Sequence, residues 1–169
     1  KHSYVSSLVI DKALAKEPKA RFIFLTLTVK NVSSQDLKDE LRNLTKGFDR
    51  LFKRAKVKKN LLGYMRATEV TYNSETKEYH PHLHILLMVK STYFKGKNNY
   101  IEQDEWTSLW QQSMRLSYVP VVNVKVVRPG KQGLKKAVLE TAKYPVKPLN
   151  FKEIGDDEIV SVVSTLYYA

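Results

Sequence analysis

Apolar and polar residues follow alternating strand-like and helix-like patterns along the chain, and these patterns predict the fold class. Residues 21–30 read RFIFLTLTVK, and their apolar side chains fall on both faces of a strand, as expected for a central strand covered on two sides. Leucine and phenylalanine then recur at steps of three and four residues over positions 37–52. This spacing predicts an amphipathic helix that is capped by Ser33 or Ser34 and runs to about Lys56.

The middle of the chain predicts a hairpin, then a helix and a strand. Residues 62–72 and 80–90 read as two strands, and the polar residues 73–77 between them are typical of a turn. Apolar residues at helical spacing mark a second helix over 106–114, and residues 119–127 read as another strand. The hairpin therefore places two strands side by side and antiparallel.

The two ends of the chain add further elements. Residues 134–142 predict a third helix, which Pro145 disturbs, residues 156–168 predict a terminal helix, and residues 5–10 predict either an edge strand or a helix. The order strand, helix, strand, strand, helix, strand, helix predicts a mostly antiparallel sheet with helices on one face, an α+β sandwich. At 169 residues, without a repeat or a linker, residues 1–169 are expected to form a single domain.

The chain is strongly basic, and its charge points to a polyanionic partner. Lys and Arg number 29 against 17 Asp and Glu, a formal net charge of +12. Such a charge attracts nucleic acid, with a merely soluble basic surface as the alternative. Basic residues cluster at 53–59 and again over 125–147. The first cluster ends the first helix, so it also complements the helix dipole.

Composition excludes several classes of protein and of site. The longest apolar run, 83–89, is far shorter than the roughly 20 residues of a membrane-spanning helix, and no signal peptide precedes the first strand, so we expect a soluble protein without a membrane partner. The absence of cysteine excludes disulfides, thiolate metal sites and cysteine nucleophiles, and it fits a reducing cytoplasm. A metal site would use histidine and carboxylate. Because the sequence opens on Lys1, we also expect a domain of a longer chain.

Three of the four histidines lie in HPHLHIL, residues 80–86. In a strand, His82 and His84 project from the same face, so their imidazoles converge on one point. His80 shares their parity, but Pro81 distorts the entrance of the strand. We therefore expect His80 beside the ligands, as a second-shell or DNA-contacting residue.

A carboxylate on the preceding strand completes this group. A turn around residue 76 brings Glu69 opposite Leu83, and therefore between the two histidines on the adjacent strand. Two neutral imidazoles and one carboxylate leave open coordination positions for a divalent ion that polarises a substrate oxygen. For a phosphodiester substrate we expect Mg²⁺ or Mn²⁺. The alternative is an ion pair between Glu69 and surface histidines, with no metal.

A tyrosine and a glutamate near the predicted third helix suggest phosphodiester chemistry. Glu140 and Tyr144 are one helical step of four residues apart and share a face. A tyrosyl oxygen can attack a phosphodiester and release the 3′-hydroxyl where cations or a metal stabilise the charge, whereas Glu140 could activate water instead. Most of the ten tyrosines must be packing residues, so spacing alone does not single out Tyr144. The expected DNA-binding residues are Arg128, Lys131, Lys136, Lys143 and Lys147.

Three motifs resemble those of one known family. FLTLTV at 24–29, HPHLHIL at 80–86 and ETAKYPVK at 140–147 are similar, in this order, to the motifs of the replication initiator (Rep) proteins of bacterial rolling-circle plasmids, which belong to the HUH endonuclease superfamily. GYMRATEVT at 63–71 and WTSLW at 106–110 resemble further features of that family. The resemblance implies the fold of an HUH endonuclease domain, a ferredoxin-like sandwich similar to RNA-recognition motifs.

The resemblance also implies a role for each motif residue. His82 and His84 match the paired histidines that bind the metal, and Glu69 matches the strand carboxylate that supplements them. Tyr144 matches the nucleophile that becomes linked to the 5′-phosphate of nicked DNA. Glu140 matches an acidic residue that the single-tyrosine plasmid branch uses, with water, for a terminating hydrolysis.

The resemblance further implies partners and leaves alternatives open. The expected substrate is plasmid origin DNA, nicked in a single-stranded or hairpin segment in the bacterial cytoplasm, so that the 3′-hydroxyl primes replication. The resemblance also implies a host helicase as partner. The sequence contains no phosphate-binding P-loop, so we expect no helicase activity in this segment itself. The alternatives are a single-tyrosine transposase, a relaxase, although relaxases place the tyrosine ahead of the histidines, or a non-catalytic module that binds nucleic acid through basic and aromatic residues.

Overall fold

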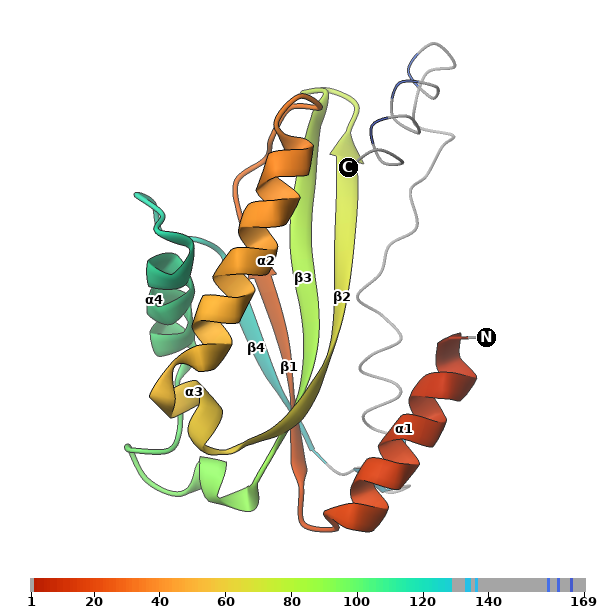
Figure 1. The fold of residues 1–169 in the computed structure, drawn as a ribbon, viewed down its shortest axis with the longest axis vertical. Coiled ribbons are helices and arrows are strands. Elements are labelled where there is room, and N and C mark those ends of the chain that lie inside the picture. Colours follow the sequence, from red (N-terminus) through yellow and green to blue (C-terminus); the bar gives the residue numbers. More distant parts are fainter. Residues whose placement is uncertain are drawn as a thin grey trace.

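The computed structural model describes residues 2–128 and six single residues beyond them, with the backbone alone for residues 2–8. The elements, in chain order, are α1 His2–Lys16, β1 Arg21–Thr28, α2 Leu37–Lys53, α3 Ala55–Lys59, β2 Leu61–Asn73, β3 Glu78–Val89, the 3₁₀ turn η1 Ser91–Phe94, α4 Gln103–Met114 and β4 Val122–Val127 (Figure 1). The predicted third and terminal helices lie outside the described residues, apart from single positions. None of the described helices is long and apolar enough to span a membrane.

The strands form one sheet in the order β2-β3-β1-β4, and each neighbouring pair is antiparallel. Helix α2 connects β1 to β2, and α4 connects β3 to β4, so the path from β1 to β4 is β-α-β-β-α-β. This is the split β-α-β arrangement of ferredoxin-like folds. The predicted α+β class and antiparallel sheet are confirmed.

Helices α2 and α4 cover one face of the sheet, and the main core lies between them and the strands. Ile23, Leu25 and Leu27 of β1 are each 0% exposed and pack with Phe48 of α2 and Trp110 of α4. Figure 1 shows α2 lying along the sheet with α4 beside it. The odd-numbered apolar residues of β1 thus form the floor of the helix layer.

Helix α1 packs on the opposite face, so the prediction that helices cover one face is wrong. Ile10 of α1 is buried in a second cluster with Phe22, Leu86 and Met88. These strand residues are even-numbered, so their apolar side chains project from the opposite face of the sheet, where burial under α1 removes them from water. The alternative for residues 5–10 is thereby decided, because they lie in a helix and not in an edge strand.

The first predicted helix is shorter than expected at both ends. Its N-cap is Asp36, not Ser33 or Ser34, and no side chain bonds to its first amide groups. The Ser33 hydroxyl donates instead to the Asp36 carboxylate, at 3.2 Å. At the other end, Arg54 has extended backbone angles (φ −65°, ψ 136°), which separate α2 from the short helix α3.

Part of the basic cluster at 53–59 stabilises the fold. The Lys56 ammonium lies 2.8 Å from the Glu105 carboxylate of α4. Arg54 donates to the Ser113 hydroxyl at 3.0 Å and to the Gln112 side chain at 3.2 Å. Two cations of this cluster therefore connect the helices, as well as adding to the positive charge.

Candidate metal centre

The register of the β2–β3 hairpin determines which side chains meet on the face of the sheet opposite α2 and α4. Glu69 pairs directly with His82, so the prediction that it lies opposite Leu83 is wrong by one residue. The reason is the length of the connection: Asn73 pairs with Glu78 and leaves four residues in the turn. A shift of one residue moves a whole strand to the other face, and the observed register puts Glu69 on the histidine face.

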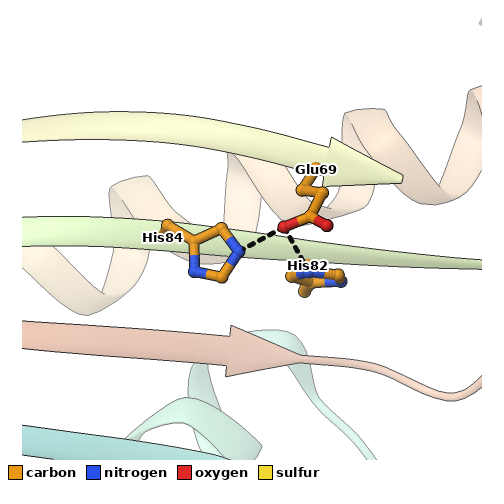
Figure 2. A group of neighbouring side chains, drawn as sticks. All are labelled: Glu69, His82 and His84. Atoms are coloured by element: carbon orange, nitrogen blue, oxygen red, sulfur yellow. Dashed lines mark hydrogen bonds and ion pairs between the residues drawn. The ribbon is translucent and has the colours of Figure 1, made fainter. Parts of the chain in front are cut away.

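The three side chains converge on one carboxylate oxygen. Glu69 Oε2 lies 3.0 Å from His82 Nε2 and 2.6 Å from His84 Nε2 (Figure 2). One potential ligand atom from each of the three residues lies within 4.8 Å of the other two. Glu69 and His84 are each only 8% exposed. A buried group of two imidazoles and one carboxylate could bind a metal ion.

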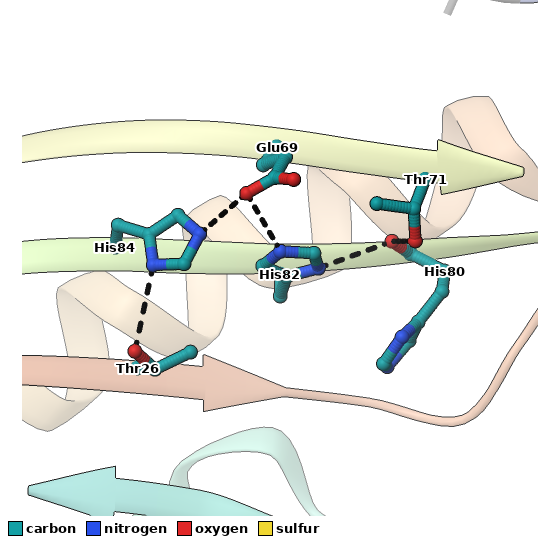
Figure 3. A network of polar contacts seen from close by, with 6 residues as sticks. All are labelled: Thr26, Glu69, Thr71, His80, His82 and His84. Carbon is teal, nitrogen blue, oxygen red and sulfur yellow. Dashed lines mark hydrogen bonds and ion pairs between the residues drawn. The ribbon is translucent and has the colours of Figure 1, made fainter. Parts of the chain in front are cut away.

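The second nitrogen of each imidazole has its own partner (Figure 3). His82 Nδ1 lies 3.2 Å from the backbone oxygen of His80, and His84 Nδ1 lies 3.4 Å from the Thr26 hydroxyl. A carbonyl oxygen only accepts, so His82 Nδ1 must carry the proton of this hydrogen bond. When His82 is neutral, its Nε2 therefore presents a lone pair toward Glu69, as in a ligand to a metal.

This arrangement needs a proton or a metal ion between the ligand atoms. A neutral His82 and an ionised Glu69 would place a lone pair and a carboxylate oxygen 3.0 Å apart, and two acceptors repel each other. Either a proton on Nε2 or a metal ion between the ligands removes the repulsion. Imidazole and carboxylate are both common ligands of divalent metals, so the residues fit the expected ion.

Burial favours the neutral form of His84, which is the form that a metal ligand needs. Burial lowers the pKa of His84 below its usual 6.5, and the hydrogen bond to Glu69 offsets part of this effect. Burial also lowers the pKa of His80, with a further contribution from His82. Metal ligands must be deprotonated, so a lowered pKa keeps His84 ready to bind at neutral pH.

Two neighbours of the group, Thr26 and Thr28, were not predicted from the sequence, although a pattern in the sequence could have indicated them. Thr26 and Thr28 are polar positions of equal parity in an otherwise apolar strand, and β1 pairs Thr26 with His84 and Thr28 with His82. This alternation could have indicated that β1 contributes to the same face. His80 lies at the margin: its ring is 5.3 Å from that of His82, and its backbone oxygen holds His82 Nδ1.

The remaining predicted site residues are only partly described. Arg128 is exposed directly after β4, and Lys136 is exposed as well. Arg128 lies beside a cavity that Arg21 and Tyr100 also line. Outside the described residues lie Lys131, Glu140, Lys143, Tyr144 and Lys147, whose roles stay predictions.

The chain is similar over most of its length to proteins that are already known. Residues 2–169 match the family described as Replication protein. A "Protein rep" of Streptococcus pneumoniae serotype 2 (strain D39 / NCTC 7466) is 52% identical over 168 residues, which cover 99% of this chain and 51% of the relative. A "Protein rep" of Lactiplantibacillus plantarum is 48% identical over 174 residues, covering 100% and 55%. A "Replication protein" of Staphylococcus aureus is 43% identical over 162 residues, covering 94% and 68%.

The matches cover most of this chain but only part of each relative. The chain spans about half the length of the first two relatives. No solved structure matches it. The family match covers all but the first residue, and three relatives exceed 40% identity over most of the chain. The chain therefore belongs to the replication protein family, which confirms the resemblance to Rep proteins seen in its motifs.

Proposed function

We propose that the chain is the DNA-nicking and strand-transfer domain of a plasmid rolling-circle replication initiator. The observation that carries the proposal is the buried group of Glu69, His82 and His84 in a member of the replication protein family. A phosphodiester in the active site needs a positive charge at its non-bridging oxygens, and a divalent ion held by these ligands would supply it. The expected ion is Mg²⁺ or Mn²⁺.

Tyr144 is the proposed nucleophile. Its phenolic oxygen loses its proton and forms a bond to the scissile phosphorus, while the bond from phosphorus to the 3′-oxygen breaks. The 3′-oxygen takes up a proton and becomes the hydroxyl that primes synthesis. The DNA 5′-phosphate remains linked to the tyrosine as a phosphodiester, so a second strand can be joined without an external energy source.

Glu140 is proposed to end the reaction. Its carboxylate takes a proton from water, the water oxygen bonds to phosphorus, and the tyrosyl oxygen leaves with a proton. Arg128, Lys131, Lys136, Lys143 and Lys147 are proposed to contact the phosphates of the origin, which fits the net charge of +12. A host helicase would then separate the strands in the bacterial cytoplasm.

A covalent adduct tests the proposal. A library of hairpin origin oligonucleotides, incubated with the protein and Mn²⁺, should contain a member that forms an adduct resistant to denaturation. Tyr144→Phe should abolish the adduct, and Tyr100→Phe, at a partly exposed position distant in sequence, should retain it. If the wild-type protein forms no adduct with any member of the library, a non-catalytic nucleic-acid-binding module becomes the better explanation.

Substitutions of the metal ligands and of Glu140 should give different results in the same assay. His82→Ala and His84→Ala should abolish nicking and leave duplex binding largely intact, because phosphate contacts use other residues. An equal loss of binding would make these histidines structural. Glu140→Ala should still nick but accumulate more trapped adduct, and faster release would contradict its role in activating water.

A further inference from the structure

A cavity of about 630 Å³ opens beside the histidine group, at the end of β1. Its lining includes Thr28 at the end of β1, Lys30 two residues beyond it, and His80 of β3. The segment before β4 contributes Tyr118, Val119 and Val121. The volume lies within the range of roughly 300–1,000 Å³ that is typical of small-ligand sites. The cavity is therefore large enough to take a nucleobase.

The cavity lies next to the candidate metal centre. The ring of His80, which lines the cavity, lies 5.3 Å from the ring of His82. Thr28, which also lines it, is the strand partner of His82. A strand whose phosphate sits at the metal ligands would therefore place a neighbouring nucleotide at this cavity.

Part of the cavity wall is apolar and held in place. Val119 and Val121 are 72% and 64% exposed, the highest values among the exposed large apolar side chains of the described residues. The Thr28 hydroxyl donates to the backbone oxygen of Val121 at 2.7 Å, and Trp110 donates to the backbone oxygen of Thr28 at 2.8 Å. Helix α4 therefore supports the segment that presents these valines to solvent.

The polar residues of the cavity favour a base over a phosphate. The Lys30 ammonium lies 4.3 Å from the centroid of the Tyr118 ring, and the Lys30 backbone N–H donates to the Tyr118 hydroxyl at 3.0 Å. A positioned aromatic ring, a cation and apolar side chains are the features that bind unpaired bases. The Glu78 carboxylate also lines the cavity. It would repel a phosphate but accept a hydrogen bond from the amino group of a base.

We propose that this cavity binds one unpaired base of the DNA strand, next to the candidate metal centre and without need of the metal. The proposal deepens the proposed function, since it rests on that function for the identity of the strand. In this proposal, Val119, Val121 and Tyr118 contact a base that is not paired in a duplex. Single-stranded DNA would then be favoured over duplex DNA at this site.

Photocrosslinking in EDTA tests the cavity without any nicking. The probe is a 12-nucleotide strand of alternating cytosine and thymine with a central 5-iododeoxycytidine, and the crosslinked residues are identified by mass spectrometry. We expect crosslinks at Tyr118 or His80. The variant V119S/V121S should lower the yield at these residues by about fivefold or more, in line with the loss of a base contact. V9S, which changes an exposed valine on α1, should keep the wild-type yield.

Two further measurements make the result decisive. The same probe annealed to its complement should give a much lower yield at Tyr118 and His80, and the thermal unfolding of V119S/V121S should match that of the wild type. Equal yields from single strand and duplex, a wild-type yield from V119S/V121S, or crosslinks only elsewhere would overturn the proposal. Crosslinks in the cavity without a Mn²⁺-dependent adduct would support the base-binding site and contradict the proposed nicking function. An adduct without these crosslinks would support the nicking function and contradict the base-binding site.

Discussion

Thr26 holds the imidazole of His84 from the side opposite Glu69. Its hydroxyl lies 3.4 Å from His84 Nδ1, while Glu69 lies 2.6 Å from Nε2, so both ring nitrogens have a partner. The Phe24 ring stacks on the same imidazole, with centroids 5.9 Å apart and planes inclined by 25°. These contacts from β1 fix the orientation in which His84 presents Nε2 to an ion.

Thr26→Val should therefore weaken metal binding without unfolding the protein. Valine keeps the shape of threonine but cannot bond to His84 Nδ1, and the loss of such an outer partner typically costs about 10–100-fold in metal affinity. Isothermal titration with Mn²⁺ measures the change. Thr45→Val, at an exposed position whose hydroxyl donates to the Leu41 backbone oxygen, is the matched control. An unchanged Mn²⁺ affinity in Thr26→Val would show that Thr26 does not position His84.

The lowered pKa of His84 should make the metal-free protein sensitive to acid. Its folded pKa lies below the ordinary 6.5, so between these two values the unfolded chain binds a proton that the folded chain does not. The free energy of unfolding should thus be unaffected by this group above about pH 6.5 and decrease as the pH falls below it. The NMR signals of the His84 ring, followed against pH, should show a midpoint below 6.5. A midpoint at or above 6.5 would contradict the effect of burial.

At the scale of elements, the contact between α2 and α4 depends on a residue without a side chain. A Cβ atom on Gly47 would overlap the Met114 sulfur and lie 2.9 Å from Met114 Cγ. Gly47 is buried in α2, and Met114 ends α4. A side chain at position 47 would therefore force the Met114 side chain to move from its place between the helices.

Gly47→Val should destabilise the fold by about 1–3 kcal/mol, because the added methyl groups overpack a filled site. Urea unfolding measures this loss. Gly63→Val is the matched control, since a Cβ atom there meets nothing within 4 Å and valine suits a strand. If both variants unfold at the same urea concentration, the contact between the helices is looser than described.

The helices and strands could be predicted from the sequence. The register of the hairpin and the segment that covers the second face of the sheet could not. Alternation and three- or four-residue spacing identified the strands and helices because these periods reflect burial directly. The hairpin residues 73–77 are all polar, so their pattern does not distinguish a four-residue turn from a five-residue one. That choice decides whether Glu69 faces His82 or Leu83. The place of α1 was not predictable either, since a sheet with apolar residues on both faces does not specify which segment covers the second one.

At the scale of the whole molecule, the sheet separates two layers with different tasks. The helix layer contains the main core, and the other face carries Glu69, His82 and His84 together with the cluster beneath α1. Strand parity and the hairpin predicted that Glu69, His82 and His84 share one face, and the motif at 24–29 lies beside them because β1 pairs with β3 and β3 pairs with β2. Glu140 and Tyr144 stay predictions, since they lie outside the described residues.

The net charge of +12 should make DNA binding strongly dependent on salt. For single strands, the logarithm of the binding constant falls with the logarithm of salt concentration by about 0.7 for each phosphate contacted. Arg128→Ala should reduce this slope by about one contact, as measured by fluorescence anisotropy across a salt series. Arg42→Ala, which removes an exposed cation paired with Asp39 on α2, is the control and should leave the slope unchanged. Equal slopes for wild type and Arg128→Ala would exclude a phosphate contact by Arg128.

The two tryptophans of the chain also make folding and binding separately observable. Trp106 and Trp110 both lie in α4, are 1% and 0% exposed, and donate their indole N–H groups to the Tyr93 hydroxyl and the Thr28 backbone oxygen. Their emission should shift to longer wavelength when the helix layer unfolds. Metal and DNA would bind on the opposite face of the sheet, so tryptophan emission can monitor stability while a labelled oligonucleotide reports binding in the same sample.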